Sequence, residues 1–341
     1  MPFCHAKTPF ALLCALLLVT PVQQAAEPET AKQERPPIKV ALDTDLHAGK
    51  AKHASKEPNP CEGQLEGEYM GSDVCADCHA DKTQTMAMSP HGQAADPRTP
   101  FGKEGCETCH GPGELHFQTE GNCIISMNGR FGESIEQRNA ICLGCHQGGS
   151  QIHWFSSIHE AEGVGCVSCH YIHQPNDVTD RATQSQVCYK CHKDIRAATY
   201  RAYTHPIREN KVICSDCHNA HGSTGPSSLK QYTINENCYA CHADKRGPFL
   251  WEHNPASEDC TLCHRVHGSN HVALLNRPGP QLCQQCHAAE AAGGGRSHIS
   301  SFYDFDTTNP RQMRFVVAKN CANCHIKVHG SNHPSGAALQ R

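Results

Sequence analysis

A five-residue segment, Cys-x-x-Cys-His, occurs ten times between residues 75 and 325 and limits what this chain can fold into. The ten copies use twenty of the 24 cysteines and leave about 25 residues of chain for each copy. Aromatic residues make up only 6% of the 341 residues. A conventional hydrophobic core of this size is hard to assemble from such a chain, so we expect another component to fill the interior.

The spacing of the repeated segment identifies that component. Two thiols at this separation add across the two vinyl groups of a haem, and the histidine that follows lies below the iron as its proximal ligand. Paired Cys-x-x-Cys units also build tetrahedral zinc sites, which is the alternative. A histidine after every second cysteine, ten times over, favours haem. The sequence therefore predicts ten covalently attached c-type haems.

The haem-attachment residues follow directly from the repeat. The cysteines predicted to bind haem covalently are Cys75, Cys78, Cys106, Cys109, Cys142, Cys145, Cys166, Cys169, Cys188, Cys191, Cys214, Cys217, Cys238, Cys241, Cys260, Cys263, Cys283, Cys286, Cys321 and Cys324. The predicted proximal iron ligands are His79, His110, His146, His170, His192, His218, His242, His264, His287 and His325.

The sixth position of each iron decides between electron transfer and catalysis, because an open position is what binds a substrate. The second, fourth, sixth, eighth and tenth motifs each have one histidine upstream and one shortly downstream, which gives ten spare histidines for ten irons. The predicted distal ligands are His91, His116, His159, His173, His205, His221, His253, His267, His298 and His329.

This rhythm predicts five two-haem modules, each made of an odd motif followed by an even one. His173, His221 and His267 lie three residues after a proximal histidine. Three residues span at most about 10 Å, which is too short to reach the other face of the same haem. We expect these three to bind the odd haem of their own module, while the upstream histidine binds the even haem. The remaining downstream histidines, His116 and His329, are assigned by analogy.

Two alternatives to this ligand set stay open at this point. His271 and His333 end a repeated Val-His-Gly-Ser-Asn-His segment and could each replace the histidine four residues earlier. Met86 and Met88 lie close before an upstream histidine, so one haem with a methionine ligand is conceivable. The number of histidines favours two histidine ligands on every iron.

The N-terminal part of the chain carries no haem motif. Residues 1–26 have an apolar run and a small-residue end that are typical of a secretory signal peptide. Residues 27–68 are rich in Pro, Lys and Glu and are expected to form a flexible leader, followed by the decahaem domain at 69–341. No direct membrane span is expected. Cys61 and Cys123 lie outside the motifs and could pair or stay free.

The fold expected from these features is that of a multihaem cytochrome c. Short α-helices that carry the motifs, joined by loops and with little or no β-sheet, would wrap around ten stacked haems and give an elongated body. The formal charge of −4, made more negative by haem propionates, makes nucleic acid a poor partner.

The ten motifs, the export signal and the segment Cys106-Glu-Thr-Cys109-His110-Gly-Pro-Gly-Glu-Leu-His116 resemble the periplasmic decahaem cytochromes of the MtrA/DmsE family. The resemblance covers roughly residues 68 to 335. It implies a periplasmic protein associated with the outer membrane and held within a β-barrel porin. Such a protein would exchange electrons with periplasmic and extracellular redox proteins. The leader of about forty residues departs from the motif-bearing pattern.

Three functions compete on this sequence. The first is an electron conduit within a porin partner, the second a free periplasmic electron shuttle or store, and the third a multihaem reductase. A reductase needs a haem with an open coordination position and often a variant motif. No variant motif occurs, and each haem has a candidate sixth ligand, so no catalytic residues are expected.

Overall fold

The computed structural model describes residue 61 and residues 67–174, 178–287, 320–334 and 336–340. The chain divides into two units, residues 1–56 and 57–341, and all the described residues belong to the second. The predicted signal peptide, most of the leader and His298 lie outside the described residues.

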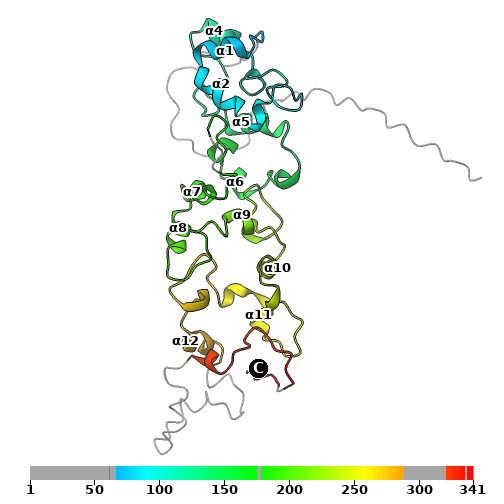
Figure 1. Ribbon diagram of the computed structural model, residues 1–341, viewed down its shortest axis with the longest axis vertical. Helices are drawn as coiled ribbons and strands as arrows, with labels where there is room; N and C mark the ends of the chain where they lie inside the picture. The colour runs from blue at the N-terminus through cyan, green and yellow to red at the C-terminus, as the bar shows by residue number, and fades with distance from the viewer. Residues whose placement is uncertain (1–60, 62–66, 175–177, 288–319, 335, 341) are drawn as a thin grey trace, which may run out of the picture. The chain divides into compact units, whose positions relative to one another are not determined.

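Short helices joined by loops make up the described part of the chain (Figure 1). The α-helices are α1 (Ser72–Cys78), α2 (Ala80–Ala87), α3 (Glu107–His110), α4 (Glu114–Gln118), α5 (Ile135–Leu143), α6 (Ile158–Ala161), α7 (Gln184–Cys188), α8 (Lys193–Thr199), α9 (Cys214–Cys217), α10 (Ile234–Tyr239), α11 (Asn254–Glu258) and α12 (Gly279–Gln284). The 3-10 helices are η1 (Pro90–Gly92), η2 (Gly149–Gln151), η3 (Cys166–Ser168), η4 (Pro226–Ser228), η5 (Ala243–Lys245), η6 (Cys260–Leu262), η7 (Val272–Leu274) and η9 (Cys321–Asn323). The described residues contain isolated β-bridges but no strand, which confirms the expected helix-and-loop fold.

Each motif forms one helical turn. In all ten copies the backbone N–H of the histidine donates to the carbonyl oxygen of the first cysteine, four residues earlier, at 2.9–3.1 Å. One turn of this kind brings residues i, i+3 and i+4 to the same side of the backbone. The local structure therefore presents two thiols and one imidazole together, as attachment of one haem requires.

Odd and even motifs differ in where the turn lies. The first cysteine of an odd motif lies in an α-helix, as Cys142 does in α5 and Cys238 does in α10. Ser134 and Thr233 cap the N-termini of these two helices by accepting backbone N–H groups, as N-cap hydroxyls commonly do. Even motifs mostly lie on a single short turn that starts at the first cysteine itself, such as η3 and η6.

The two motifs of a module pack against each other. Helix α5 contacts η3, α7 contacts α9, α10 contacts η6 and α12 contacts η9. Buried amide oxygens join the turns: Asn139 accepts the N–H of Cys166 at 2.9 Å, and Asn235 accepts that of Cys260 at 2.8 Å. In the first module the Ser72 hydroxyl accepts the N–H of Cys106 at 3.1 Å. Each of these acceptors lies three residues before the first cysteine of the odd motif.

The apolar core that the protein's own side chains form is small. The hydrophobic residues buried within the described part of the chain are Cys61, Met86, Cys123, Trp154, Val187, Tyr189, Ile207 and Ile213. Several of the buried residues are polar and act as hydrogen-bonding connectors between turns, as Asn139 and Asn235 do. This composition agrees with an interior that protein side chains alone do not fill.

Among the described residues, no helix is long and apolar enough to cross a bilayer.

The buried connectors between turns should contribute measurably to stability. Gln184 in α7 is 9% exposed, accepts the N–H of Ser215 at 3.0 Å and donates to the carbonyl of Val178 at 2.9 Å. Gln184→Ala leaves both groups without this partner and should lower the free energy of unfolding of the haem-loaded protein by about 1–3 kcal/mol in guanidinium titrations.

The matched control for this change is Gln186→Ala, because Gln186 lies in the same helix with its side chain exposed. It should change the unfolding free energy by less than about 0.5 kcal/mol. Equal effects of the two substitutions would contradict a docking role for Gln184.

Candidate haem-ligand pairs

Nine pairs of histidine rings lie opposite each other within the described residues at centroid distances of 5.9–6.3 Å, six of them stacked and three tilted or edge-on. In each pair one ring is a motif histidine and the other is one of the predicted distal histidines. The pairs are His79 with His116, His110 with His173, His146 with His91, His170 with His221, His192 with His159, His218 with His267, His242 with His205, His264 with His329 and His287 with His253.

The spacing of the paired rings fits one metal ion between them. Two metal–imidazole bonds of about 2 Å in line, plus roughly 1.2 Å from each ligating nitrogen to its ring centre, place the two centroids about 6.4 Å apart. The observed 5.9–6.3 Å lies just below this value. The rings therefore have the separation that two axial ligands of one haem iron need.

Backbone carbonyls hold many of these rings by the other nitrogen. Among the paired rings, Nδ1 lies 2.7–3.0 Å from a carbonyl oxygen in His110, His116, His159, His205, His218 and His264. The same contact, at 2.6 Å, occurs at the motif histidine His325, which belongs to none of the nine pairs. A carbonyl only accepts hydrogen bonds, so Nδ1 carries the proton and Nε2 keeps its lone pair. This is the usual outer support of a metal-bound histidine, and it fixes both the tautomer and the ring orientation.

Burial keeps several of the paired rings neutral. It is the main cause that lowers the imidazole pKa of His91, His170, His173, His221, His267 and His329. The facing ring adds to the lowering of the pKa, as His146 does for His91 and His110 does for His173. A neutral imidazole is the form that a metal ion binds, so these surroundings favour coordination over protonation.

The structure pairs these rings differently from the arrangement expected within modules. His173, expected opposite His146 of its own module, faces His110 of the preceding one. His91, expected opposite His110, faces His146 of the following module. Only His116, which faces His79, has its expected partner in its own module.

Six further expected pairings within modules, those that the described residues test, are wrong in the same way. His221, His267 and His329 each face the even motif histidine of the preceding module, and His159, His205 and His253 each face the odd motif histidine of the following one. A reach of three residues excludes the haem of the same motif, but it does not decide whether the histidine meets a haem earlier or later in the chain.

Neighbouring modules therefore exchange histidines in both directions. At the junction of the first and second modules, His91 goes forward and His173 goes back. The same exchange occurs at the three following junctions. His298, the remaining predicted distal ligand, lies outside the described residues, while Nδ1 of His325 donates to the Ala338 carbonyl.

The methionine alternative finds no geometric support at His91, because its ring faces His146. The side chain of Met88 is 83% exposed, and the sulfur of Met86 accepts a hydrogen bond from the Ser89 hydroxyl at 3.4 Å. The alternative ligands His271 and His333 belong to none of the nine ring pairs, in which His267 and His329 take part.

The twenty motif cysteines carry no disulfide, and their thiols are half-buried or exposed. The first cysteines of the two motifs in a module lie next to each other: the side chain of Cys142 contacts that of Cys166, and the side chain of Cys188 contacts that of Cys214. The attachment points of the two haems of a module are therefore adjacent.

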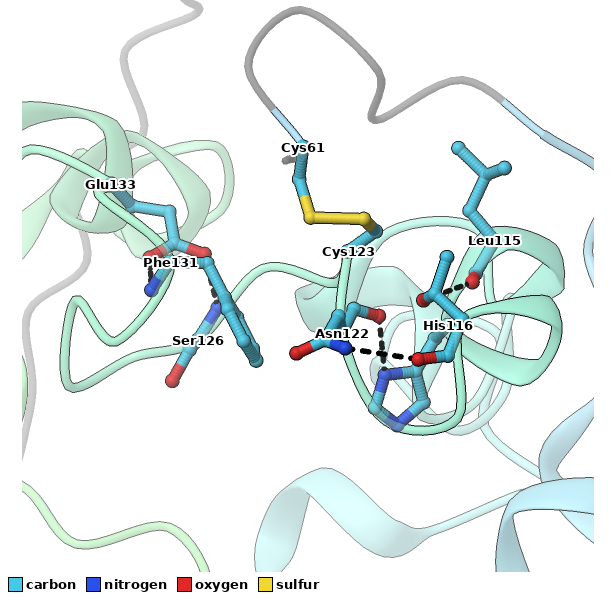
Figure 2. The surroundings of a disulfide bond; sticks show 9 residues. Cys61, Leu115, His116, Asn122, Cys123, Ser126, Phe131 and Glu133 are labelled. Atoms are coloured by element: carbon cyan, nitrogen blue, oxygen red, sulfur yellow. Dashed lines mark hydrogen bonds between the residues drawn. A yellow bond between two sulfur atoms is a disulfide. The ribbon is translucent and has the colours of Figure 1, made fainter. Parts of the chain in front are cut away.

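Cys61 and Cys123 form a disulfide with a sulfur–sulfur distance of 2.08 Å, which answers the question that the sequence left open. The bond joins the end of the leader to the loop that carries Asn122 (Figure 2). The carbonyl of Asn122 accepts the Nδ1–H of His116 at 2.8 Å. The disulfide thus lies beside the support of one paired ring.

Comparison with known proteins agrees with this geometry. The doubled CXXCH motif model matches residues 205–247 and 253–292, and the model of NrfB-like c-type cytochrome proteins matches residues 106–185. Over 284 residues the chain is 40% identical to Multiheme cytochrome MtrA of Shewanella baltica (strain OS185), covering 81% of this chain and 84% of that protein. The chain belongs to the MtrA family of multihaem c-type cytochromes.

Membership of the MtrA family gives the motifs their chemistry: they bind c-type haem and not zinc, and the protein transfers electrons. Each match to the doubled model starts at an upstream histidine and joins an even motif to the odd motif after it. That unit is displaced by one motif from the modules defined above. It contains both rings of a pair, His205 with His242 in one match and His253 with His287 in the other. Sequence reasoning missed the carbonyls that hold the rings, because backbone atoms leave no mark in a motif.

Removal of one distal ring tests its assignment. His267→Ala should convert one haem equivalent of the oxidised protein from low spin to high spin, since no other ring of the described residues faces His218 at this distance. Near-infrared magnetic circular dichroism counts the change, and added imidazole should reverse it.

His271→Ala is the matched control, because His271 lies in the same loop and belongs to no ring pair. It should leave every haem low-spin. Loss of low-spin signal in His271→Ala, with His267→Ala unaffected, would reverse the assignment.

Proposed function

We propose that this protein is a decahaem electron conduit without an open haem coordination position. Its ten motifs would attach ten c-type haems through the twenty motif cysteines, with each motif histidine as proximal ligand and the ten predicted distal histidines opposite them. Bound in this way, c-type haems supply reversible one-electron transfer. The five two-motif modules would place them in sequence order.

The observation that carries this proposal is the set of nine facing ring pairs. A distal imidazole opposite every paired motif histidine fills the position that a substrate would need. Carbonyls on Nδ1 hold six of these rings in place, which favours closed coordination at their pairs. A reductase would need at least one motif histidine without a second ring opposite it, and each motif histidine in the nine described pairs has such a ring.

We place the protein in the periplasm, associated with the outer membrane, on the strength of the predicted signal peptide and the family resemblance. A β-barrel porin would surround part of the decahaem domain and exclude lipid from its backbone. Periplasmic redox proteins would exchange electrons at one end, and an extracellular donor or acceptor at the other.

Isolation from native outer membranes tests the conduit against a free shuttle. We expect a β-barrel protein to remain bound in a fixed ratio through detergent and high-salt washes. Recovery only from the soluble periplasmic fraction, with no barrel protein attached, would replace the conduit by the shuttle.

Carbon monoxide tests closed coordination separately from the partner. The fully reduced protein should form no stoichiometric carbon monoxide complex in its Soret spectrum, because both axial positions hold histidine. The His267→Ala variant provides the positive control and should bind one equivalent. One equivalent bound by the unaltered protein would instead support a reductase.

A further inference from the structure

A two-residue antiparallel bridge joins the third and fourth modules at the point where they exchange histidines. The N–H of Tyr203 donates to the carbonyl of Ser269 at 2.9 Å, and the N–H of Ser269 donates to the carbonyl of Tyr203 at 2.8 Å. Tyr203 lies two residues before His205, and Ser269 lies two residues after His267. The bridge therefore fixes the backbone two residues away from each of the two exchanged histidines, His205 and His267.

A second contact at this junction links the ring of one exchanged histidine to the backbone beside the other. Nδ1 of His205 donates to the carbonyl of Val266, the residue just before His267, at 2.9 Å. The ring of His205 faces His242, and that of His267 faces His218. One short backbone contact thus supports two rings that face two different motif histidines.

The same bridge recurs at the next junction. Trp251 and Ser331 exchange backbone hydrogen bonds of 2.9 and 2.8 Å, and they lie two residues before His253 and two residues after His329. The junction of the second and third modules keeps the ring contact, with Nδ1 of His159 donating to the Ala220 carbonyl at 2.8 Å. The backbone bridge thus occurs at two junctions and the ring contact at two, each at equivalent positions, which indicates a common arrangement of these junctions.

A glycine makes the close approach possible. Gly268 follows His267 with a φ of +140°, and a Cβ atom there would overlap the carbonyl oxygen of Ala198. Gly330 follows His329 with a φ of +136°, and its Cβ would overlap the ring of Phe249. Any larger residue at these positions must push the loop away from the preceding module, because L-residues rarely adopt this φ and the space is filled.

We propose that Gly268 and the Tyr203–Ser269 bridge are positioning elements that couple the axial ligation of two haems in neighbouring modules. Displacement of the loop moves His267 away from His218 and, through the Val266 carbonyl and the bridge, moves His205 away from His242. The inference rests on the ligand roles proposed above. It adds that displacement of this loop disturbs both ligations at once, whereas removal of one ring disturbs only its own.

Counting spin states in Gly268→Ala tests the coupling. We expect two haem equivalents to lose low-spin ligation, against the one lost in His267→Ala, with covalent haem content unchanged. Gly71→Ala is the matched control, because Gly71 also has a positive φ, +87°, but open space around its Cβ position. It should convert no haem.

The outcomes separate the coupling from the ligand assignment. One equivalent, or none, lost in Gly268→Ala while His267→Ala loses one would overturn the coupling and leave the ligands intact. No effect in His267→Ala would overturn the ligand assignment itself.

Substitutions at Tyr203, in the third module, test the bridge from its other side. Tyr203→Pro removes the N–H that Ser269 accepts, and it should convert the same two equivalents. Tyr203→Ala keeps that N–H and removes only a side chain that is 43% exposed, so it should convert none. Equal effects of the two substitutions would assign the result to the side chain and contradict the bridge.

Hydrogen exchange on the unaltered haem-loaded protein covers the case in which these variants fail to fold. The amides of Tyr203 and Ser269 should be protected and should exchange at matching rates, because one opening event exposes both. Fast exchange at Tyr203 with Ser269 still protected would rule out the bridge.

Discussion

The close separation of two imidazole rings, as two ligands of one iron would require, is the constraint on which the arrangement of this chain depends. One ring comes with the haem, because the helical turn of the motif fixes cysteine and histidine together. The second ring has to arrive from elsewhere at about 6 Å, and in eight of the nine described pairs it arrives from an adjacent module. With iron between the rings of each pair, coordination would take the place of much of the apolar packing that a domain of this length otherwise uses.

The backbone contacts around the rings follow from this requirement. A ring that must meet an iron in another module needs a fixed tautomer and a fixed direction, and the carbonyls of residues such as Val266 and Ala220 supply both. Buried polar residues such as Asn139 and Asn235 fix the two motif turns within a module. The disulfide at Cys123 adds a covalent link at the first module, where the ring of His116 stays within its own module.

Sequence reasoning reached the motif turns, the helix-and-loop fold and the family, because covalent attachment ties these to residue spacing. It also picked out every spare histidine that the structure places opposite a motif histidine. It failed on which ring meets which, as with His173, because a reach of three residues excludes the adjacent haem but cannot distinguish the haem before from the haem after. The bridge at Ser269 could not be predicted from the sequence, because it is made by backbone atoms that every residue carries.

The central claim is that axial ligands are exchanged between modules, and an experimental structure of the haem-loaded protein tests it most directly. The account predicts that the haem attached through Cys142 and Cys145, with His146 as its proximal ligand, has His91 as its sixth ligand. It equally predicts His173 on the iron of His110. A structure with His91 on the iron of His110 and His173 on the iron of His146 would return both ligands to their own modules and contradict the account.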